Sequence, residues 1–116
     1  LAGSLAASAG SLLIALAAVL FWPLTETLLT DRLWFGLIIA GAGFIGSLVD
    51  SLLGATVQAI YWCSQCAKET EKTPLHTCQT PTSLLRGWRW MNNDVVNFLC
   101  TASAALVAWL LTILVY

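Results

Sequence analysis

Charged side chains are scarce in this chain of 116 residues. Lys and Arg number five, Asp and Glu number six, and together they make up 9% of the sequence. A soluble domain typically has about 25% charged residues. The net charge of −1 also leaves no basic surface for nucleic acid. The low charge therefore argues against a soluble globular domain, and we expect no nucleic-acid partner.

Apolar residues are correspondingly abundant. Hydrophobic residues make up 59% of the chain, and its mean hydropathy is +0.82. They gather in three runs, at about residues 1–21, 33–62 and 92–116, and each run is long enough to cross about 30 Å of hydrocarbon. We predict an all-α fold, a polytopic transmembrane helix bundle in the lipid bilayer with three spans and a polar loop at residues 63–91.

The basic residues predict an orientation for this integral membrane protein. Four of the five lie in the 63–91 loop, at Lys68, Lys72, Arg86 and Arg89, and the connection before the second span has only Arg32. Because basic residues are enriched in cytoplasmic loops, we expect the 63–91 loop to be cytoplasmic.

A single carboxylate, Asp50, lies inside the second apolar run. At about 100° per residue, small and polar side chains share an arc of roughly 140° with it; they are Gly43, Gly46, Ser47, Ser51, Gly54 and Gln58. An ionisable group at membrane depth costs a few kcal/mol and usually faces a bundle interior. Asp50 is either a polar contact to another helix or part of a site that holds Mg²⁺ against phosphate oxygens.

The glycines of this run also match a nucleotide-binding motif. Residues 41–46 read G-A-G-F-I-G, which fits the dinucleotide fingerprint G-x-G-x-x-G. That fingerprint works only at a strand-to-helix turn, whereas here it lies within 30 apolar residues. We therefore expect no dinucleotide-binding domain.

The polar loop contains four soft metal ligands in the pattern Cys63-x2-Cys66-x9-His76-x-Cys78. Three thiolates and one imidazole form a common closed, tetrahedral zinc site. On a reducing cytoplasmic face a disulfide is not expected, so the alternatives are structural Zn²⁺ and free thiols. Cys100 lies within the third span, where we expect a small apolar core residue.

The segment Arg86-Gly87-Trp88-Arg89-Trp90-Met91 meets the third span at Asn92, Asn93 and Asp94. One interpretation is an aromatic belt with snorkelling cations. The other is an anion site, because guanidinium groups suit phosphate and a helix start capped by Asn92 or Asn93 favours anions. Asp94 would then hold a metal ion rather than the phosphate.

Two blocks of this sequence resemble one integral-membrane family, which includes plant phytyl-phosphate kinase and transmembrane protein 19. They are Gly46-Ser47-Leu48-Val49-Asp50-Ser51-Leu52-Leu53-Gly54-Ala55 with Gln58, and Asn93-Asp94-Val95-Val96-Asn97. Members are about twice as long as this chain, which begins at Leu1 inside an apolar stretch. We therefore expect it to be a C-terminal half whose upstream helices, with a further acidic motif, are missing here.

The resemblance implies a kinase that phosphorylates an isoprenoid monophosphate of the phytyl type to the diphosphate, with a nucleoside triphosphate and Mg²⁺. Asp50 and Asp94 would then coordinate the magnesium and phosphate. Arg86 and Arg89 would neutralise phosphate charge. The other members of the expected substrate set are Ser47, Ser51, Gly54, Gln58, Asn93 and Asn97. The alternative is a membrane transporter or scaffold without enzyme activity, in which Asp50 is a coupling or packing residue.

Overall fold

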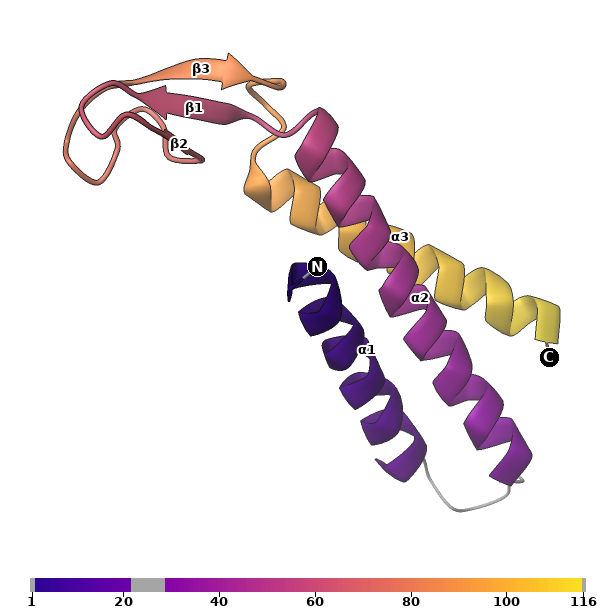
Figure 1. The fold of residues 1–116 in the computed structure, drawn as a ribbon. Coiled ribbons are helices and arrows are strands. Elements are labelled where there is room, and N and C mark those ends of the chain that lie inside the picture. The colour runs from indigo at the N-terminus through magenta and orange to yellow at the C-terminus, as the bar shows by residue number, and fades with distance from the viewer. Residues whose placement is uncertain (1, 22–28, 116) are drawn as a thin grey trace. The chain divides into compact units, whose positions relative to one another are not determined.

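A computed structural model describes residues 2–21 and 29–115, with side chains from residue 6 onward. The outer ends of the first and third predicted spans, residues 1 and 116, lie outside them. The order of elements is α1 (Ala2–Phe21), α2 (Leu29–Thr56), β1 (Ile60–Cys63), β2 (Lys68–Thr70), β3 (Thr82–Arg86) and α3 (Asn93–Val115) (Figure 1). The chain divides into two compact units. The first unit is Leu1–Val49 with Cys100–Tyr116, and the second unit is Asp50–Leu99.

Helices of the first unit approach each other closely at glycines of α2. A Cβ atom on Gly36 would lie 2.6 Å from a methyl group of Val19 in α1, and one on Gly43 would lie 2.7 Å from Ser11. A Cβ atom on Gly46 would lie 2.9 Å from Ala104 in α3. Small residues let helices pack without a hydrophobic driving force in lipid. Gly36, Gly43 and Gly46 of α2 are therefore points of close helix contact in this unit.

Two of the helices could cross a membrane by length and composition. They are α2 and α3, with a mean hydropathy of 1.8 and 2.3 over their most apolar windows. The part of α1 with described side chains, Ala6–Phe21, is a shorter apolar helix. The first predicted span, at residues 1–21, therefore stays a prediction.

The second helix differs from the prediction at its C-terminal end. The expected span ended at residue 62, but α2 ends at Thr56, and residues 60–63 form β1. The helix also runs unbroken through Gly41, Gly43, Gly46 and Gly54. No strand precedes the G-A-G-F-I-G segment within residues 29–40, which are helical. The structure therefore agrees with the exclusion of a dinucleotide-binding turn.

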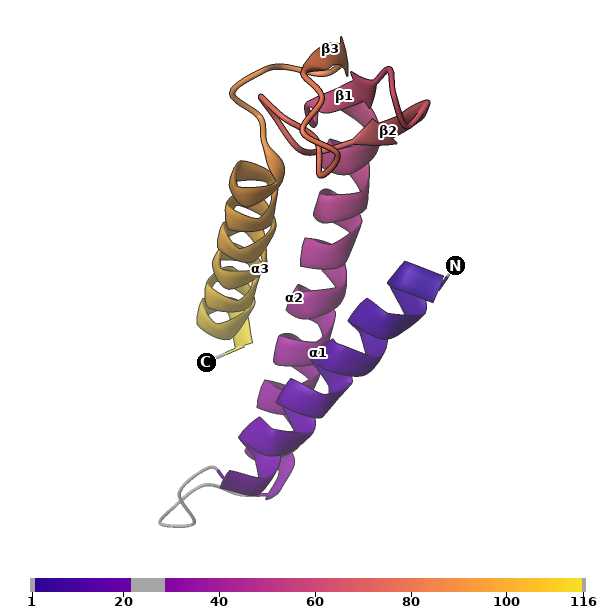
Figure 2. The same cartoon turned by 90° about the vertical axis from the view of Figure 1, so that its left-hand side faces the viewer.

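The polar loop contains a small sheet, so the all-α prediction was wrong for this part of the chain. The three strands are antiparallel in the order β2-β1-β3, with β1 in the middle (Figures 1 and 2). Tyr61 pairs with Thr70 on one side and with Leu84 on the other. Aromatic and β-branched residues such as Ile60, Tyr61 and Trp62 favour a pleated, half-buried position. Because it pairs on both sides, β1 is the central strand of the sheet in the second unit.

Candidate functional site

The end of α2 and the start of α3 are joined by backbone hydrogen bonds in the second unit. The Ala59 N–H donates to the Met91 carbonyl at 2.8 Å, and the Trp88 N–H donates to the Val57 carbonyl at 3.0 Å. Around these bonds Ala59 and Met91 are buried, and so is Val96 in the first turns of α3. The segment that follows α2 and the segment that precedes α3 are thus held together next to the two sequence blocks.

Arg86 caps the C-terminal end of α2. Its Nη1 atom donates to the carbonyl oxygens of Gly54 at 3.3 Å and Ala55 at 3.1 Å. The last carbonyl groups of a helix have no partner within the helix, and a cation there also interacts favourably with the helix dipole. Arg86 therefore has a structural role, and its exposed side chain keeps further N–H donors.

Gln58 is buried and bound within the protein. Its exposed fraction is 7%, and its Nε2 atom donates to a carboxylate oxygen of Glu71 at 3.0 Å. Glu71 was not among the residues singled out in the sequence. It lies thirteen positions away, in a polar segment without a motif, so no local signal identifies it. Its contact orients the Gln58 amide.

The start of α3 has the cap that the sequence predicted. The Val95 N–H donates to the side-chain oxygen of Asn92 at 3.0 Å, so Asn92, rather than Asn93, occupies the N-cap position. Asp94 lies in the first turn, where its charge complements the helix dipole. Asn93, Asp94 and Asn97 are all exposed. These three side chains are thus accessible to solvent.

Nine of the ten predicted phosphate-site residues belong to the second unit; Ser47 belongs to the first. Asp50 and Gly54 are half-buried on the last turns of α2, and Ser51 is exposed there. The hydrogen bonds of Arg86 bring it to Gly54. Among the described residues, one group of three or more His, Cys, Asp or Glu side chains lies close enough together to hold a metal ion, and it is the Cys/His cluster. Asp50 and Asp94 belong to no such group.

Arg89 lies apart from Arg86, at a polar cavity of about 610 Å³ in the second unit. Hydroxyl-bearing side chains line it together with the exposed guanidinium; they are Tyr61, Thr73, Thr82 and Ser83. Next to it in sequence, the exposed rings of Trp88 and Trp90 stack with their centroids 5.6 Å apart. An exposed indole pair fits the aromatic-belt interpretation, whereas the cavity fits an anion. Trp88 and Trp90 thus fit the aromatic-belt interpretation, and Arg89 fits the anion-site interpretation.

The Cys/His cluster comes together as the ligand spacing predicted. The four donor atoms of Cys63, Cys66, His76 and Cys78 lie within 4.8 Å of one another. The Cys78 sulfur is 3.5 Å from that of Cys63 and 3.4 Å from that of Cys66. Nδ1 of His76 is 3.4 Å from the Cys66 sulfur and 3.3 Å from the Cys78 sulfur. Four soft donors therefore surround one point.

The thiols of this cluster differ in acidity. The Thr80 hydroxyl, 3.4 Å from the Cys78 sulfur, and then His76 lower the pKa of Cys78 to about 5. A hydrogen bond with Cys78, followed by desolvation, raises the pKa of Cys66 to about 11. The Cys78 thiol is therefore the more acidic of the two.

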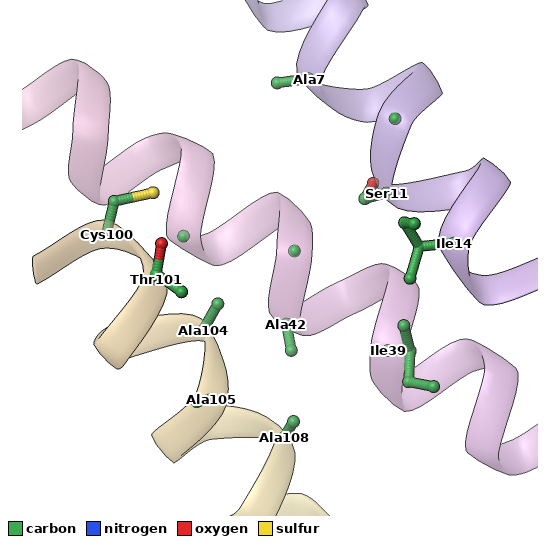
Figure 3. A pocket seen from close by; sticks show the side chains of 13 residues that line it. Ala7, Ser11, Ile14, Ile39, Ala42, Cys100, Thr101, Ala104, Ala105 and Ala108 are labelled. Carbon is green, nitrogen blue, oxygen red and sulfur yellow. The ribbon is translucent and has the colours of Figure 1, made fainter. Parts of the chain in front are cut away.

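The first unit has an apolar cavity of about 530 Å³ among its three helices. Its lining is mostly small residues, and Figure 3 shows Ala42 and Ile39 of α2 opposite Ala104 and Ala108 of α3. Cys100 also lies on this lining and is half-buried, as expected for a small apolar residue. The volume lies within the range of small-molecule sites, so this cavity can hold an apolar chain.

Comparison with known proteins places the chain in one family. The family described as "Integral membrane protein DUF92" matches residues 1–105. Searches of curated proteins and of solved structures gave no match. The matched range contains every residue of the candidate site and of the Cys/His cluster. Together with two apolar helices long enough to cross a bilayer, it shows that this chain is an integral membrane protein of the DUF92 family.

Proposed function

We propose that this protein is a kinase that forms an isoprenoid diphosphate from the monophosphate. The γ-phosphoryl group of a nucleoside triphosphate would pass to a terminal oxygen of the prenyl monophosphate, which yields the diphosphate and a nucleoside diphosphate. The resemblance of the two sequence blocks to the phytyl-phosphate kinase and transmembrane protein 19 family suggests the reaction. The observation that carries it is that hydrogen bonds in the second unit join the segment after α2 to the segment before α3, next to these two blocks.

The donor set on these helix ends fits Mg²⁺. This ion prefers oxygen ligands and usually takes one or two carboxylates, with substrate phosphates completing its shell. Asp50 and Asp94 would hold the ion, with amide oxygens of Asn93 and Asn97 beside Asp94 in sequence. Bound magnesium would supply charge neutralisation at the phosphate oxygens. No third carboxylate is needed for this role.

The remaining polar groups would position the phosphates. Phosphoryl transfer depends mostly on positioning and electrostatic stabilisation. Arg89, whose cavity also contains three aliphatic hydroxyl groups, would bind phosphate oxygens bidentately. Arg86 would bind phosphate through the N–H groups that do not cap α2. Ser51 would bind it through its exposed hydroxyl group.

The isoprenoid tail would occupy the apolar cavity of the first unit. Ala108 lines this cavity from α3, and Phe at this position would fill part of it. We expect Ala108→Phe to shift the preference toward shorter isoprenoids, measured as kcat/KM for a chain-length series. Ala9→Phe, at an exposed position of α1 that does not line the cavity, is the control. An unchanged series in Ala108→Phe protein would place the tail elsewhere.

The sheet would face the cytoplasm, where nucleoside triphosphates are found. Lys68 and Lys72, the two lysines of this chain, are both exposed in the second unit. We expect a membrane-impermeant amine reagent to label them in sealed inside-out vesicles and to spare them in right-side-out vesicles. Peptide mass spectrometry reads the label. Labelling in right-side-out vesicles would reverse the orientation.

The activity itself is tested with full-length protein in detergent. Prenyl monophosphates are incubated with Mg²⁺ and nucleoside triphosphates labelled in the γ-phosphate. We expect the label in the prenyl diphosphate. If folded protein transfers no label from any donor, the kinase proposal fails, and a transporter or scaffold in which Asp50 is a coupling or packing residue takes its place.

A further inference from the structure

The Cys/His cluster has no part in the proposed phosphate chemistry. We propose that Cys63, Cys66, His76 and Cys78 bind one Zn²⁺ ion as a closed structural site. The ion would use three thiolate sulfurs and Nδ1 of the imidazole. All four positions of a tetrahedral ion are then taken by protein, so the site stabilises structure and has no position for substrate.

The distances between donor atoms fit a tetrahedral ion. With zinc–sulfur bonds of about 2.3 Å and zinc–nitrogen bonds of about 2.0 Å, tetrahedral geometry separates two sulfurs by about 3.8 Å and a sulfur from a nitrogen by about 3.5 Å. The sulfur pairs of Cys78 measure 3.5 and 3.4 Å, and the His76 nitrogen is 3.4 and 3.3 Å from two sulfurs. Movements of a few tenths of an ångström would therefore seat the ion.

Backbone turns hold the donors in place before any metal binds. Cys63 is the last residue of β1 and is fully buried. Ala67, directly after Cys66, has a φ of 48°, and Gln79, directly after Cys78, has a φ of 64°. Residues other than glycine adopt this left-handed conformation rarely, and it costs about 1–3 kcal/mol. The same kind of turn thus follows two of the three thiols.

A third turn holds His76. Its N–H donates to the Thr80 carbonyl at 2.9 Å, and the Gln79 N–H donates to the His76 carbonyl at 2.9 Å. His76 is 7% exposed, although it lies in a polar loop. The bonded turn fixes the imidazole beside Cys78, two residues away. The four donors therefore come from two segments, Cys63 with Cys66 and His76 with Cys78, which the folded loop brings together.

Other interpretations of the cluster explain fewer of its members. A disulfide needs its sulfurs about 2.05 Å apart and would use two of the three, which leaves one thiol and the imidazole without a purpose. Iron–sulfur clusters are held by four cysteines as a rule. Three sulfurs and one nitrogen in a tetrahedral arrangement are typical of zinc. Zn²⁺ is the metal ion whose usual coordination uses all four donor atoms.

Zinc at this position would stabilise the sheet that carries Arg86. Cys63 pairs with Thr82 at one end of the β1–β3 ladder, and Ile60 pairs with Arg86 at the other end. His76 and Cys78 lie in the segment that leads from β2 into β3. The ion would thus close the loop between these two strands and hold β3 against β1. Removal of the ion should loosen the sheet first.

The experiment measures zinc in full-length protein purified in detergent without chelator. We expect about one zinc ion per chain, by plasma mass spectrometry, and Cys66→Ser and His76→Ala proteins with less than about one tenth of that amount. The matched control is Cys100→Ser, because Cys100 lies outside the cluster, on α3. This control should keep its zinc. The measurement requires no enzyme activity, so its outcome is independent of the kinase proposal.

A second measurement uses the wild-type protein alone and does not depend on how variants fold. We expect a thiol reagent to modify the three cluster cysteines only after a chelator is added, as read by peptide mass spectrometry. Cobalt exchanged into the site should give the intense absorption of thiolate-bound cobalt. Metal-free protein with three reactive thiols, a disulfide within the cluster or a bound metal other than zinc would each overturn the proposal.

Discussion

If the proposed site is right, Asp50→Asn should lower kcat for prenyl diphosphate formation by about 10²-fold or more, because the substitution would remove one charge that holds Mg²⁺ at the transferring phosphate. Asparagine keeps the volume of aspartate, removes its charge and replaces one acceptor oxygen with an NH2 donor. The half-buried position on α2 should accept this change without unfolding. KM for the prenyl monophosphate should change less than kcat, and the Mg²⁺ concentration needed for half-maximal rate should rise.

The control for this substitution is Asp31→Asn. Asp31 lies in the first turn of the same helix and in the first unit, so the chemical change is matched. We expect kcat within about twofold of the wild-type value. An Asp50→Asn protein with full activity would remove Asp50 from the site.

Gly87→Ala should destabilise the second unit by about 3 kcal/mol or more. Gly87 has a φ of 80°, a conformation that costs energy for any residue with a Cβ atom. A Cβ atom there would also collide with the backbone carbonyl group of Gln58 and lie 2.7 Å from the Val57 carbonyl oxygen. These are backbone atoms at the junction of α2 and β1, so no rotamer change relieves the contact. Thermal unfolding in detergent, followed by tryptophan fluorescence, measures the loss.

Gly41→Ala is the matched control for this substitution. Gly41 lies within α2, and no atom would be within 4 Å of an added Cβ. Alanine in a helix interior is favoured over glycine by about 1 kcal/mol, so this variant should be as stable as the wild type or slightly more stable. Equal stability of Gly87→Ala and wild-type protein would contradict the close backbone contact at Gly87.

Local patterns in the sequence predicted the three helices and the gathering of the Cys and His side chains. The third span was expected at residues 92–116, and α3 covers Asn93–Val115 with Asn92 as its cap. The Cys/His ligands were recognisable because their spacing is short and their residue types are rare in this chain. Both signals lie within a few turns of backbone, so they need no knowledge of the tertiary structure.

The end of α2 and the sheet could not be predicted in the same way. Ile60, Tyr61 and Trp62 continue the apolar run, so hydropathy does not separate them from the helix. Only pairing with Lys68–Thr70 and Thr82–Arg86 makes them a strand. For the same reason the Arg86 cap, 31 and 32 residues from its partners, and the Gln58–Glu71 hydrogen bond left no local signal. Long-range contacts within the loop decide all three.

The measurement that tests the central claim most directly is a double-mutant comparison of Asp50→Asn and Asp94→Asn in the full-length kinase assay. The account predicts that both carboxylates serve one phosphate site, so the double variant should lose about as much kcat as either single variant. Losses that multiply would show that the two groups act independently. An Asp94→Asn protein with wild-type kcat would contradict a shared site at the ends of α2 and α3.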